Sequence, residues 1–441
     1  MNLDQLYTEI QTCARPVIDS RQVEEGDLFI ALRGNRSDGN QYARAALRAG
    51  ARYALVDDPA LRGAAGMLWV EDALATLQAL ARYHRRWFSI PVVGITGSNG
   101  KTTTKELVGD VLARRYRVHA TAGNLNNHIG VPLTLLGMTR QTDIAIVEMG
   151  ANHQGEIDLL SRIAEPSHGL ITNIGKAHLE GFGGIEGVKK GKSELYRYLA
   201  QTGGVGFVNR EEKFLDELSM PVARRVFYQR ARPNGGKRQP YQVALRSEEP
   251  HLQIQFWDVR GRTFRASTQL TGLHNWGNIA TAVALGQYFK VPERDIAEAL
   301  EAYVPQNNRS EWRELAGNRF FLDAYNANPT SMRHALEGFC KHSPAPRMAL
   351  LGAMFELGPY SEQEHEQMAA FAAALPLDEV VLVGRAFEPA AKKHGLTCLS
   401  GVDELIEWFE TRDPRGYHIF LKGSRGMGMD QLIEHLDPAT S

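Results

Sequence analysis

Cysteine is scarce in this sequence, since only Cys13, Cys340 and Cys398 occur among 441 residues, and they lie far apart. Such spacing excludes a disulfide-based scaffold and a metal site built from cysteine pairs. Scattered thiols are typical of proteins in a reducing compartment, so we expect a cytoplasmic location.

An excess of charge of one sign is also missing, because the formal net charge is -1. A chain near neutrality offers no general basic surface for nucleic acid, so we expect no nucleic-acid partner. No run of eighteen apolar residues is present, and the first residues show no basic segment followed by an apolar one. We therefore expect neither membrane insertion nor a secretory signal.

The length of the chain exceeds what one compact core usually holds, which predicts two to four domains. Strand and helix patterns alternate along most of the chain, which indicates an α/β protein with mostly parallel sheets. A buried strand at 90–96 opens a second unit, and the alternation restarts after a linker at 304–308. We expect an N-terminal α/β domain at 1–85, a central domain at 86–305 and a doubly wound C-terminal domain at 306–441.

Apolar stretches place some of the elements within these domains. An alternating stretch at 251–256 predicts a two-sided antiparallel strand, and an alanine-rich stretch at 278–289 predicts a helix. In the C-terminal domain the expected strands are 320–322, 348–351, 380–383 and 418–421.

A phosphate-binding loop is predicted between the strand at 90–96 and a helix expected at 101–116. Glycines let backbone N–H groups approach phosphate oxygens, and the helix N-terminus adds a favourable dipole. Lys101 can neutralise phosphate charge, and the Thr102 hydroxyl can bind Mg²⁺. The loop residues that we expect to bind ATP are Gly97, Ser98, Asn99, Gly100, Lys101, Thr102 and Thr103. The first glycine departs from the standard spacing, so a glycine turn that caps the helix, with Lys101 in solvent, is the alternative.

The form T-G-x-N-G-K-T-T resembles the loop of the Mur ligases of bacterial cell-wall synthesis and of their folylpolyglutamate synthase relatives. This resemblance implies an ATP-dependent ligase that activates a carboxylate as an acyl phosphate and joins it to an amine. It also implies a UDP-binding N-terminal domain, a central P-loop ATPase domain and a Rossmann-like C-terminal domain.

Further motifs extend the resemblance and imply catalytic and metal-binding residues. Glu148 ends an apolar strand where the family has a Mg²⁺-binding glutamate, although the residue alone could be solvated or cap a helix. His178 lies in N-I-G-K-A-H-L, which implies a ligand of a second metal ion. Lys192 matches a lysine that is carbamylated in the family, which requires a lowered pKa, and Lys189 and Lys190 are competitors. The expected catalytic residues are Lys101, His178 and Lys192, and the expected metal ligands are Thr102, Glu148, His178 and Lys192.

Other segments resemble the nucleotide contacts of the family. Residues 272–278 match G-x-H-N-x-x-N, and asparagine amides can both donate to and accept from the edge of adenine. Capping of a helix by Asn275 is compatible with that role. Arg309 resembles an interdomain arginine of the family that reaches the ATP phosphates; the alternative is an exposed cation in the linker. Asp323 is implied to hold the ribose or the metal-bound phosphates. The further nucleotide contacts that we expect are therefore His274, Asn275, Asn278, Arg309 and Asp323.

Three segments resemble the branch of the family that adds D-alanyl-D-alanine to a UDP-muramoyl tripeptide. Paired asparagines at 123–132 are implied to face the UDP-sugar. Two asparagines at 323–332 are implied to bind the incoming dipeptide; the alternative for this second segment is a polar turn. The segment 421–427 places two cations and a hydroxyl in a glycine turn that suits a carboxylate or phosphate, unless it is a solvated loop. Residues 19–21 resemble the uridine-nucleotide site. The implied substrate contacts are Ser20, Arg21, Asn126, Asn127, Asn326, Asn328, Lys422, Ser424 and Arg425.

One position departs from this branch, because Ala353 stands where an aspartate is usual, which puts any acid role there in doubt. The resemblance as a whole implies ligation of D-alanyl-D-alanine to UDP-N-acetylmuramoyl-tripeptide, with ATP and Mg²⁺, by a monomer. A sibling or folylpolyglutamate-type ligase with another amine acceptor is one alternative, and a nucleotide-dependent binding module is the other. The third residue of the tripeptide, meso-diaminopimelate or lysine, stays open.

Overall fold

The computed structural model describes residues 2–34, 37–231, 239–249, 251–305, 311–323 and 326–437. Its strands are β1 (Pro16–Val17), β2 (Leu28–Ile30), β3 (Tyr53–Val56), β4 (Met67–Trp69), β5 (Val92–Thr96), β6 (Val118–Ala120), β7 (Ile144–Glu148), β8 (His168–Ile171), β9 (Val205–Asn209), β10 (Arg224–Arg230), β11 (Gln242–Ser247), β12 (Gln253–Trp257), β13 (Thr263–Ser267), β14 (Glu311–Leu315), β15 (Asn318–Leu322), β16 (Arg347–Gly352), β17 (Glu379–Val383), β18 (Thr397–Leu399) and β19 (His418–Lys422). Its α-helices are α1 (Leu3–Ile10), α2 (Ala43–Arg48), α3 (Ala73–Arg86), α4 (Lys101–Ala113), α5 (Gly130–Leu136), α6 (Glu156–Ala164), α7 (Leu179–Phe182), α8 (Ile185–Lys192), α9 (Glu194–Thr202), α10 (Leu215–Leu218), α11 (His274–Tyr288), α12 (Glu293–Ala302), α13 (Pro329–His342), α14 (Ser361–Ala373), α15 (Glu388–His394), α16 (Val402–Arg412) and α17 (Gln431–Leu436). Short 3-10 helices are η1 (Ser20–Gln22), η2 (Gly39–Tyr42), η3 (Pro59–Leu61), η4 (Gly358–Tyr360), η5 (Arg385–Phe387) and η6 (Arg425–Met427).

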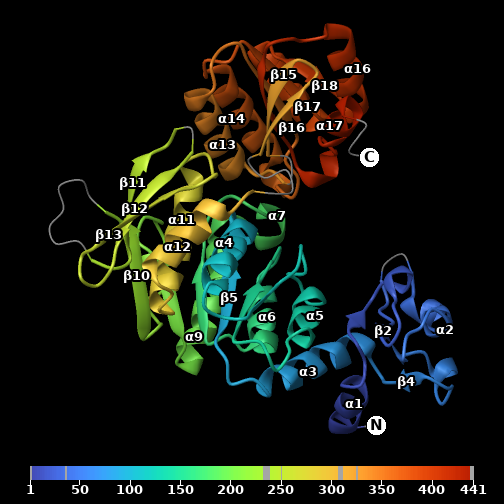
Figure 1. Ribbon diagram of the computed structural model, residues 1–441. Coiled ribbons are helices and arrows are strands. Elements are labelled where there is room, and N and C mark those ends of the chain that lie inside the picture. The colour runs from blue at the N-terminus through green and yellow to red at the C-terminus, as the bar shows by residue number, and fades with distance from the viewer. Residues whose placement is uncertain are drawn as a thin grey trace.

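The described residues form three α/β domains, each built on its own sheet (Figure 1). This confirms the α/β class and the three-domain organisation. The long helix α3 leads from the N-terminal domain into the central one, and the C-terminal domain lies over the end of the central domain that carries α7 (Figure 1). Within the described residues, no helix combines the length and the apolar character that a membrane crossing needs.

The N-terminal sheet has four short parallel strands in the order β1-β2-β3-β4. Alternate residues of a strand point to opposite faces, and both faces of this sheet are covered. Leu28 and Ile30 pack with α1 and α3 in one apolar core, whereas Phe29 between them packs with α2 in another. Small domains of this kind are stabilised by burying apolar surface on both sides of the sheet.

The central sheet has nine strands in the order β13-β12-β11-β10-β9-β8-β5-β7-β6. Its pairs from β6 to β11 are parallel, whereas β11, β12 and β13 pair in antiparallel fashion. The mostly parallel sheet is thus confirmed, and so is the antiparallel strand predicted at 251–256. Val93 and Ile95 of β5 pack with α4 and α11 on one face, and Val92 packs in the core of the other face with α6 and α9.

The C-terminal sheet has the order β14-β15-β19-β16-β17-β18 and is parallel except for the pair β14 and β15. The four predicted strands are β15, β16, β17 and β19. Phe320, Leu350 and Ile419 are fully buried in the core on one face of the sheet, against α16 and α17. The other face packs on α13 and α14, so the domain is doubly wound as predicted.

The strand order of the central sheet determines where a ligand can bind. From β5 the chain first builds β6 and β7 on one side of that strand and then places β8 on its other side. Ligands of open α/β sheets bind beyond the carboxyl end of the strands at such a switch point. The loop that follows β5 is the predicted phosphate loop, so it lies at this position.

Candidate active site

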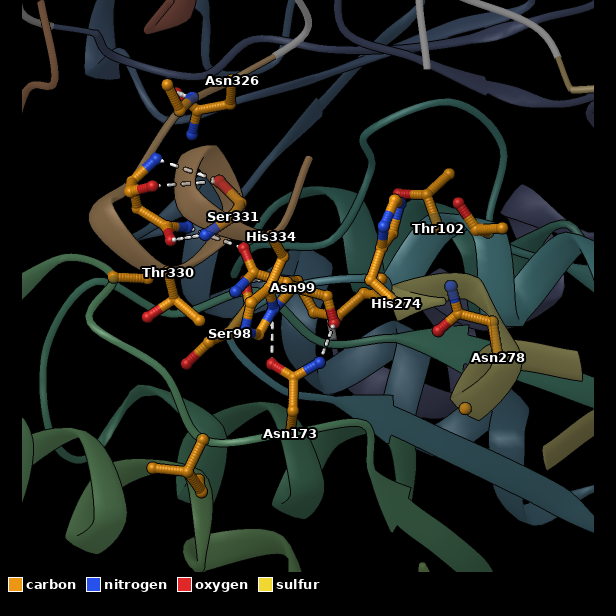
Figure 2. Close-up of a pocket in the computed structure, with 18 of the residues that line it drawn as sticks. Ser98, Asn99, Thr102, Asn173, His274, Asn278, Asn326, Thr330, Ser331 and His334 are labelled. Carbon is orange, nitrogen blue, oxygen red and sulfur yellow. Dashed lines mark hydrogen bonds between the residues drawn. The ribbon is translucent and has the colours of Figure 1, made fainter. Parts of the chain in front are cut away.

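A cavity of about 1100 Å³ lies between the central and C-terminal domains, beyond the carboxyl end of β5. It brings together residues from parts of the chain that are far apart in sequence. The predicted residues that line it are Ser98, Asn99, Gly100, Lys101, Thr102, Thr103, Asn126, Asn127, Glu148, His178, His274, Asn275, Asn278, Asp323, Asn326, Asn328 and Lys422. Figure 2 shows residues of the central domain, such as Asn99 and Asn173, close to Ser331 and His334 of the C-terminal domain.

The loop after β5 has a backbone that glycine makes possible at two positions. Gly97 has φ +144°, and a Cβ there would lie 1.9 Å from the Thr172 Oγ1. Gly100 has φ +75° and directly precedes the first turn of α4. The Lys101 Nζ donates to the carbonyl oxygens of Gly97, at 2.8 Å, and of Ser98, at 3.3 Å. The amine is therefore held over the loop, whereas the alternative of a simple capping turn placed it in solvent.

Glu148 at the end of β7 is the carboxylate that best fits a cation. Only 1% of its surface is exposed, and its Oε1 accepts from the Thr102 hydroxyl at 3.2 Å and from the Asn126 amide at 2.8 Å. Its buried Oε2 accepts no hydrogen bond from any residue that the structure describes. A buried carboxylate oxygen without a donor, beside a hydroxyl, fits a hard divalent cation such as Mg²⁺.

Lys192 differs from the two lysines near it in the chain. It is fully buried, and its Nζ donates to the Ala151 carbonyl oxygen at 2.9 Å. Burial, and next the positive charge of Lys101, hold the pKa of the Lys192 amine well below its usual value. Lys189 instead pairs with Glu186 at 2.6 Å, and Lys190 is exposed. A buried amine that loses its proton easily has the property that carbamylation requires.

His178 lies at the boundary between the two domains. Its Nδ1 is 2.5 Å from the Oε2 of Glu356, which follows β16 in the C-terminal domain. The hydrogen bond from His178 lowers the pKa of the Glu356 carboxyl. Both residues have left-handed backbones, with φ +53° at His178 and +60° at Glu356, which is a strained conformation for residues other than glycine. Strain of this kind concentrates at functional sites.

The segment predicted to contact the nucleotide forms the first turns of α11. The Asn278 Oδ1 accepts from the Thr104 hydroxyl at 3.0 Å, which ties α11 to the start of α4. Asn278 also donates to Asn275 at 2.8 Å, and Asn275 donates to the Thr271 carbonyl oxygen at 2.9 Å. His274 lines the cavity in the same turn, where the surrounding protein lowers the pKa of its imidazole. Figure 2 shows His274 and Asn278 on the same side of the cavity as Thr102.

The C-terminal wall is built around a buried lysine. The Lys422 Nζ lies 2.5 Å from the Asp323 carboxylate and donates to the Asn326 carbonyl oxygen at 2.9 Å. Asn328 caps α13 and donates to the Asn99 Oδ1 of the phosphate loop at 2.7 Å. Lys422 thus holds Asp323 and Asn326 at this wall, and Asn328 connects the start of α13 to the central domain.

Some predicted residues lie away from the cavity lining. Ser20 and Arg21 are in η1 of the N-terminal domain, where Arg21 pairs with Asp19 at 2.7 Å. Ser424 is buried and bonded to the Phe355 amide, and Arg425 is exposed at the start of η6. Gly97 and Lys192 lie behind the lining residues, and Arg309 lies outside the residues that the structure describes.

The position that departs from the branch lies outside the cavity. Ala353 is buried, and its Cβ lies 2.8 Å from where a Cβ on Gly384 would stand.

Sequence reasoning missed several cavity residues. Asn173 accepts from the Asn99 N–H and donates to the Asn99 carbonyl oxygen, both at 3.0 Å, so it holds the phosphate loop in place. Asn173 is the first residue of the segment N-I-G-K-A-H-L, which resembles the family motif and also contains His178. That motif could have identified Asn173 from the sequence. Glu356 lies three residues after Ala353, in the segment that was compared with the branch. His334 carried no such signal, because only the docking of the two domains brings it to the cavity.

Comparisons with known proteins agree with this architecture. Three family models match the chain: "Mur ligase family, catalytic domain" at residues 17–85, "Mur ligase middle domain" at 95–286 and "Mur ligase, glutamate ligase domain" at 308–425. The UDP-N-acetylmuramoyl-tripeptide--D-alanyl-D-alanine ligase of Bacillus subtilis is 35% identical over 95% of this chain and 92% of its own length. The ligase of the same name from Escherichia coli is 33% identical over 95% and 92%.

Solved structures show the same likeness in three dimensions. MurF from Acinetobacter baumannii matches with a TM-score of 0.85 at 33% identity, over 99% of this chain and 98% of that one. The MurF ligase from Thermotoga maritima in complex with ADP matches with a TM-score of 0.81 at 27% identity, over 98% of both chains.

Proposed function

The chain belongs to the Mur ligase family, and we propose that it joins D-alanyl-D-alanine to UDP-N-acetylmuramoyl-tripeptide with the conversion of ATP to ADP and phosphate. Relatives named for this reaction are similar to the chain over nearly its whole length. The observation that carries the proposal is a single cavity in which the phosphate loop, the buried Glu148 and the loop before α13 meet. A peptide-ligase reaction needs these parts together: a nucleotide site, a cation site and room for two substrates.

The reaction has two steps. The terminal carboxylate of the tripeptide attacks the γ-phosphorus of ATP, the bond to the bridging oxygen breaks, and ADP and an acyl phosphate form. The amine of D-alanyl-D-alanine then attacks the acyl carbon, the bond to the phosphate oxygen breaks, and the amine loses a proton. Both steps depend on positioning and on stabilising negative charge, as other phosphoryl transfers do.

The residues of the chain divide these tasks. Loop amides from Gly97 to Thr103 and the Lys101 amine would hold the β- and γ-phosphates, and Asp323 would hold the ribose or the metal-bound phosphates. Bound Mg²⁺ would spread the charge of the γ-phosphate, and Thr102, Glu148, His178 and a carbamylated Lys192 would hold two such ions. Both domains line the cavity, and their closure over it would keep water from the acyl phosphate.

The remaining predicted residues are proposed to bind the UDP-sugar peptide and the dipeptide. We assign residues 1–85 to the UDP-sugar with Ser20 and Arg21 as contacts, 86–305 to ATP and 306–441 to closure and dipeptide binding. Asn126 and Asn127 would face the UDP-sugar, and Asn326, Asn328 and Arg425 would face the dipeptide with its carboxylate. The substrates are cytoplasmic precursors, so we place the reaction in the cytoplasm.

Phosphate release tests the proposal. With ATP, Mg²⁺ and UDP-N-acetylmuramoyl-tripeptide, sustained release should require D-alanyl-D-alanine and yield the pentapeptide product. Tripeptides that end in meso-diaminopimelate and in lysine should be supplied separately. Release that responds to free glutamate or another single amino acid instead of the dipeptide would favour a sibling ligase. Slow hydrolysis that is indifferent to every amine would contradict ligation.

A further inference from the structure

The cavity continues beyond the phosphate loop along the first turn of α11. Asn278 contacts Gly100 at the loop, and one residue earlier Gly277 faces the amide of Asn209, which lies 3.5 Å from where a Cβ on Gly277 would stand. Asn209 ends β9, and the turn after it contributes Glu211 and Glu212 to the cavity wall. This end therefore offers a place for the base of a nucleotide whose phosphates lie at the loop.

This end of the cavity combines apolar and polar lining residues. Gly338 on α13 lines it without a side chain. Leu273, which directly precedes α11, is 46% exposed and also lines the cavity, so an apolar surface is available to a ring. An apolar wall with polar groups at its edge is typical of a base-binding site.

The polar groups at this edge are mostly engaged already. Asn275 and Asn278 bond each other and their neighbours on α11 and α4. The Asn209 Oδ1 accepts from the Glu211 N–H at 3.1 Å, and the Glu211 carboxylate accepts from the Arg230 N–H at 3.2 Å. Each of these groups therefore already has a hydrogen-bond partner within the protein, without a bound base.

Glu212 is different, because no residue that the structure describes donates a hydrogen bond to its half-buried carboxyl. Burial alone raises the pKa of this group to about 7. Glu212 lines the same cavity as Asn275 and Asn278 of α11. An acceptor that is partly removed from water and has no donor is suited to a ligand.

We propose that the Glu212 carboxyl accepts a hydrogen bond from the exocyclic amino group of adenine and so selects ATP among the nucleotides. This inference rests on the proposed function, because it assumes that the cavity binds a nucleotide. The amino group of adenine is a donor, whereas hypoxanthine and guanine carry a carbonyl oxygen at that position. Above its raised pKa the Glu212 carboxyl is ionised and cannot donate. Its oxygen facing a carbonyl oxygen then leaves two acceptors unpaired, which disfavours the wrong base.

Calorimetry with ADP and with inosine diphosphate, both with Mg²⁺ and at a pH above the raised pKa of Glu212, tests the assignment without any turnover. The unsubstituted chain should bind ADP about tenfold more tightly than inosine diphosphate, as expected for one hydrogen bond. Glu212→Ala should lose about tenfold in ADP affinity and little in inosine diphosphate affinity, so the preference disappears. Glu212→Gln should keep its ADP affinity within about twofold and gain affinity for inosine diphosphate, because an amide can accept from an amine or donate to a carbonyl.

Glu217→Ala on the exposed face of α10 is the matched control, and it should behave as the unsubstituted chain does. Circular dichroism on heating identifies any variant that is not folded. If folded Glu212→Ala keeps the full preference for ADP, or Glu212→Gln loses ADP binding, the inference is wrong. Absence of ADP binding in the unsubstituted chain would contradict the proposed function itself and this inference with it.

Discussion

At the scale of single residues, the sequence was informative where function depends on the local backbone. The loop from Gly97 to Thr103 could be identified because its glycines, lysine and threonines act from consecutive positions. The pairing of Glu356 with His178 could not be identified in this way, because the two residues lie far apart in the chain. Local patterns predict residues that act together in one segment, whereas a pair across two domains leaves no such pattern.

The choice between three neighbouring lysines shows the same limit. The residues alone left Lys189, Lys190 and Lys192 as competitors, and only the family resemblance favoured the last. The structure supplies a physical reason, since Lys192 is the lysine that is buried and has a lowered pKa. Burial depends on how α8 packs, which a charged stretch of sequence does not reveal.

Carbamylation of Lys192 can be tested directly. With ¹³C-bicarbonate, the unsubstituted chain should show a carbamate carbon signal by NMR, because a buried neutral amine reacts with CO₂. Lys192→Gln should lose that signal and at least about tenfold of the phosphate-release rate, since a ligand of the metal site is removed. Lys190→Gln, on the exposed side of the same helix, should keep both. A carbamate signal that persists in Lys192→Gln would show that another amine is modified.

At the scale of elements, long periodic stretches were predicted well, whereas several of the shortest strands were missed. The helix at 101–116 is α4, and the expected C-terminal strands are β15, β16, β17 and β19. β1, β4, β6 and β18 are two or three residues long, too short for an alternating pattern to be recognised. The helix predicted from 278 begins at His274 in the structure, because the polar motif itself forms its first turn.

Helix α14 is predicted to contribute to closure of the cavity. Its Glu364 lies 2.5 Å from Lys176 of the central domain, with 6% of the glutamate side chain exposed and 43% of the lysine side chain. Glu364→Gln should weaken domain docking by about 1 kcal/mol, since the freed lysine can return to water. The radius of gyration in small-angle X-ray scattering should increase, and the apparent KM for ATP should rise a few-fold.

Glu362→Gln is the control for this change, because Glu362 is exposed on the same helix. It should leave the scattering curve and the KM as they are in the unsubstituted chain. If Glu364→Gln behaves as Glu362→Gln does, the ion pair makes no contribution to closure.

At the scale of the whole molecule, the number and class of the domains followed from the alternation of strands and helices. The docking of the domains could not be predicted from the sequence. The contacts between domains join residues that no common sequence pattern links. Asn328 bonds Asn99, and Glu356 bonds His178. These contacts place the C-terminal domain over the phosphate loop and create the cavity, so the site belongs to the assembled chain.

The central claim is that the chain turns a peptide carboxylate into an acyl phosphate before the amine reacts. Hydroxylamine, supplied with ATP, Mg²⁺ and UDP-N-acetylmuramoyl-tripeptide but without D-alanyl-D-alanine, should intercept this species as the tripeptide hydroxamate, which mass spectrometry detects. Lys101→Ala should form at least about a hundredfold less, because the phosphates lose their main cation. Complete absence of hydroxamate, in a preparation that still makes the pentapeptide product, would contradict the account.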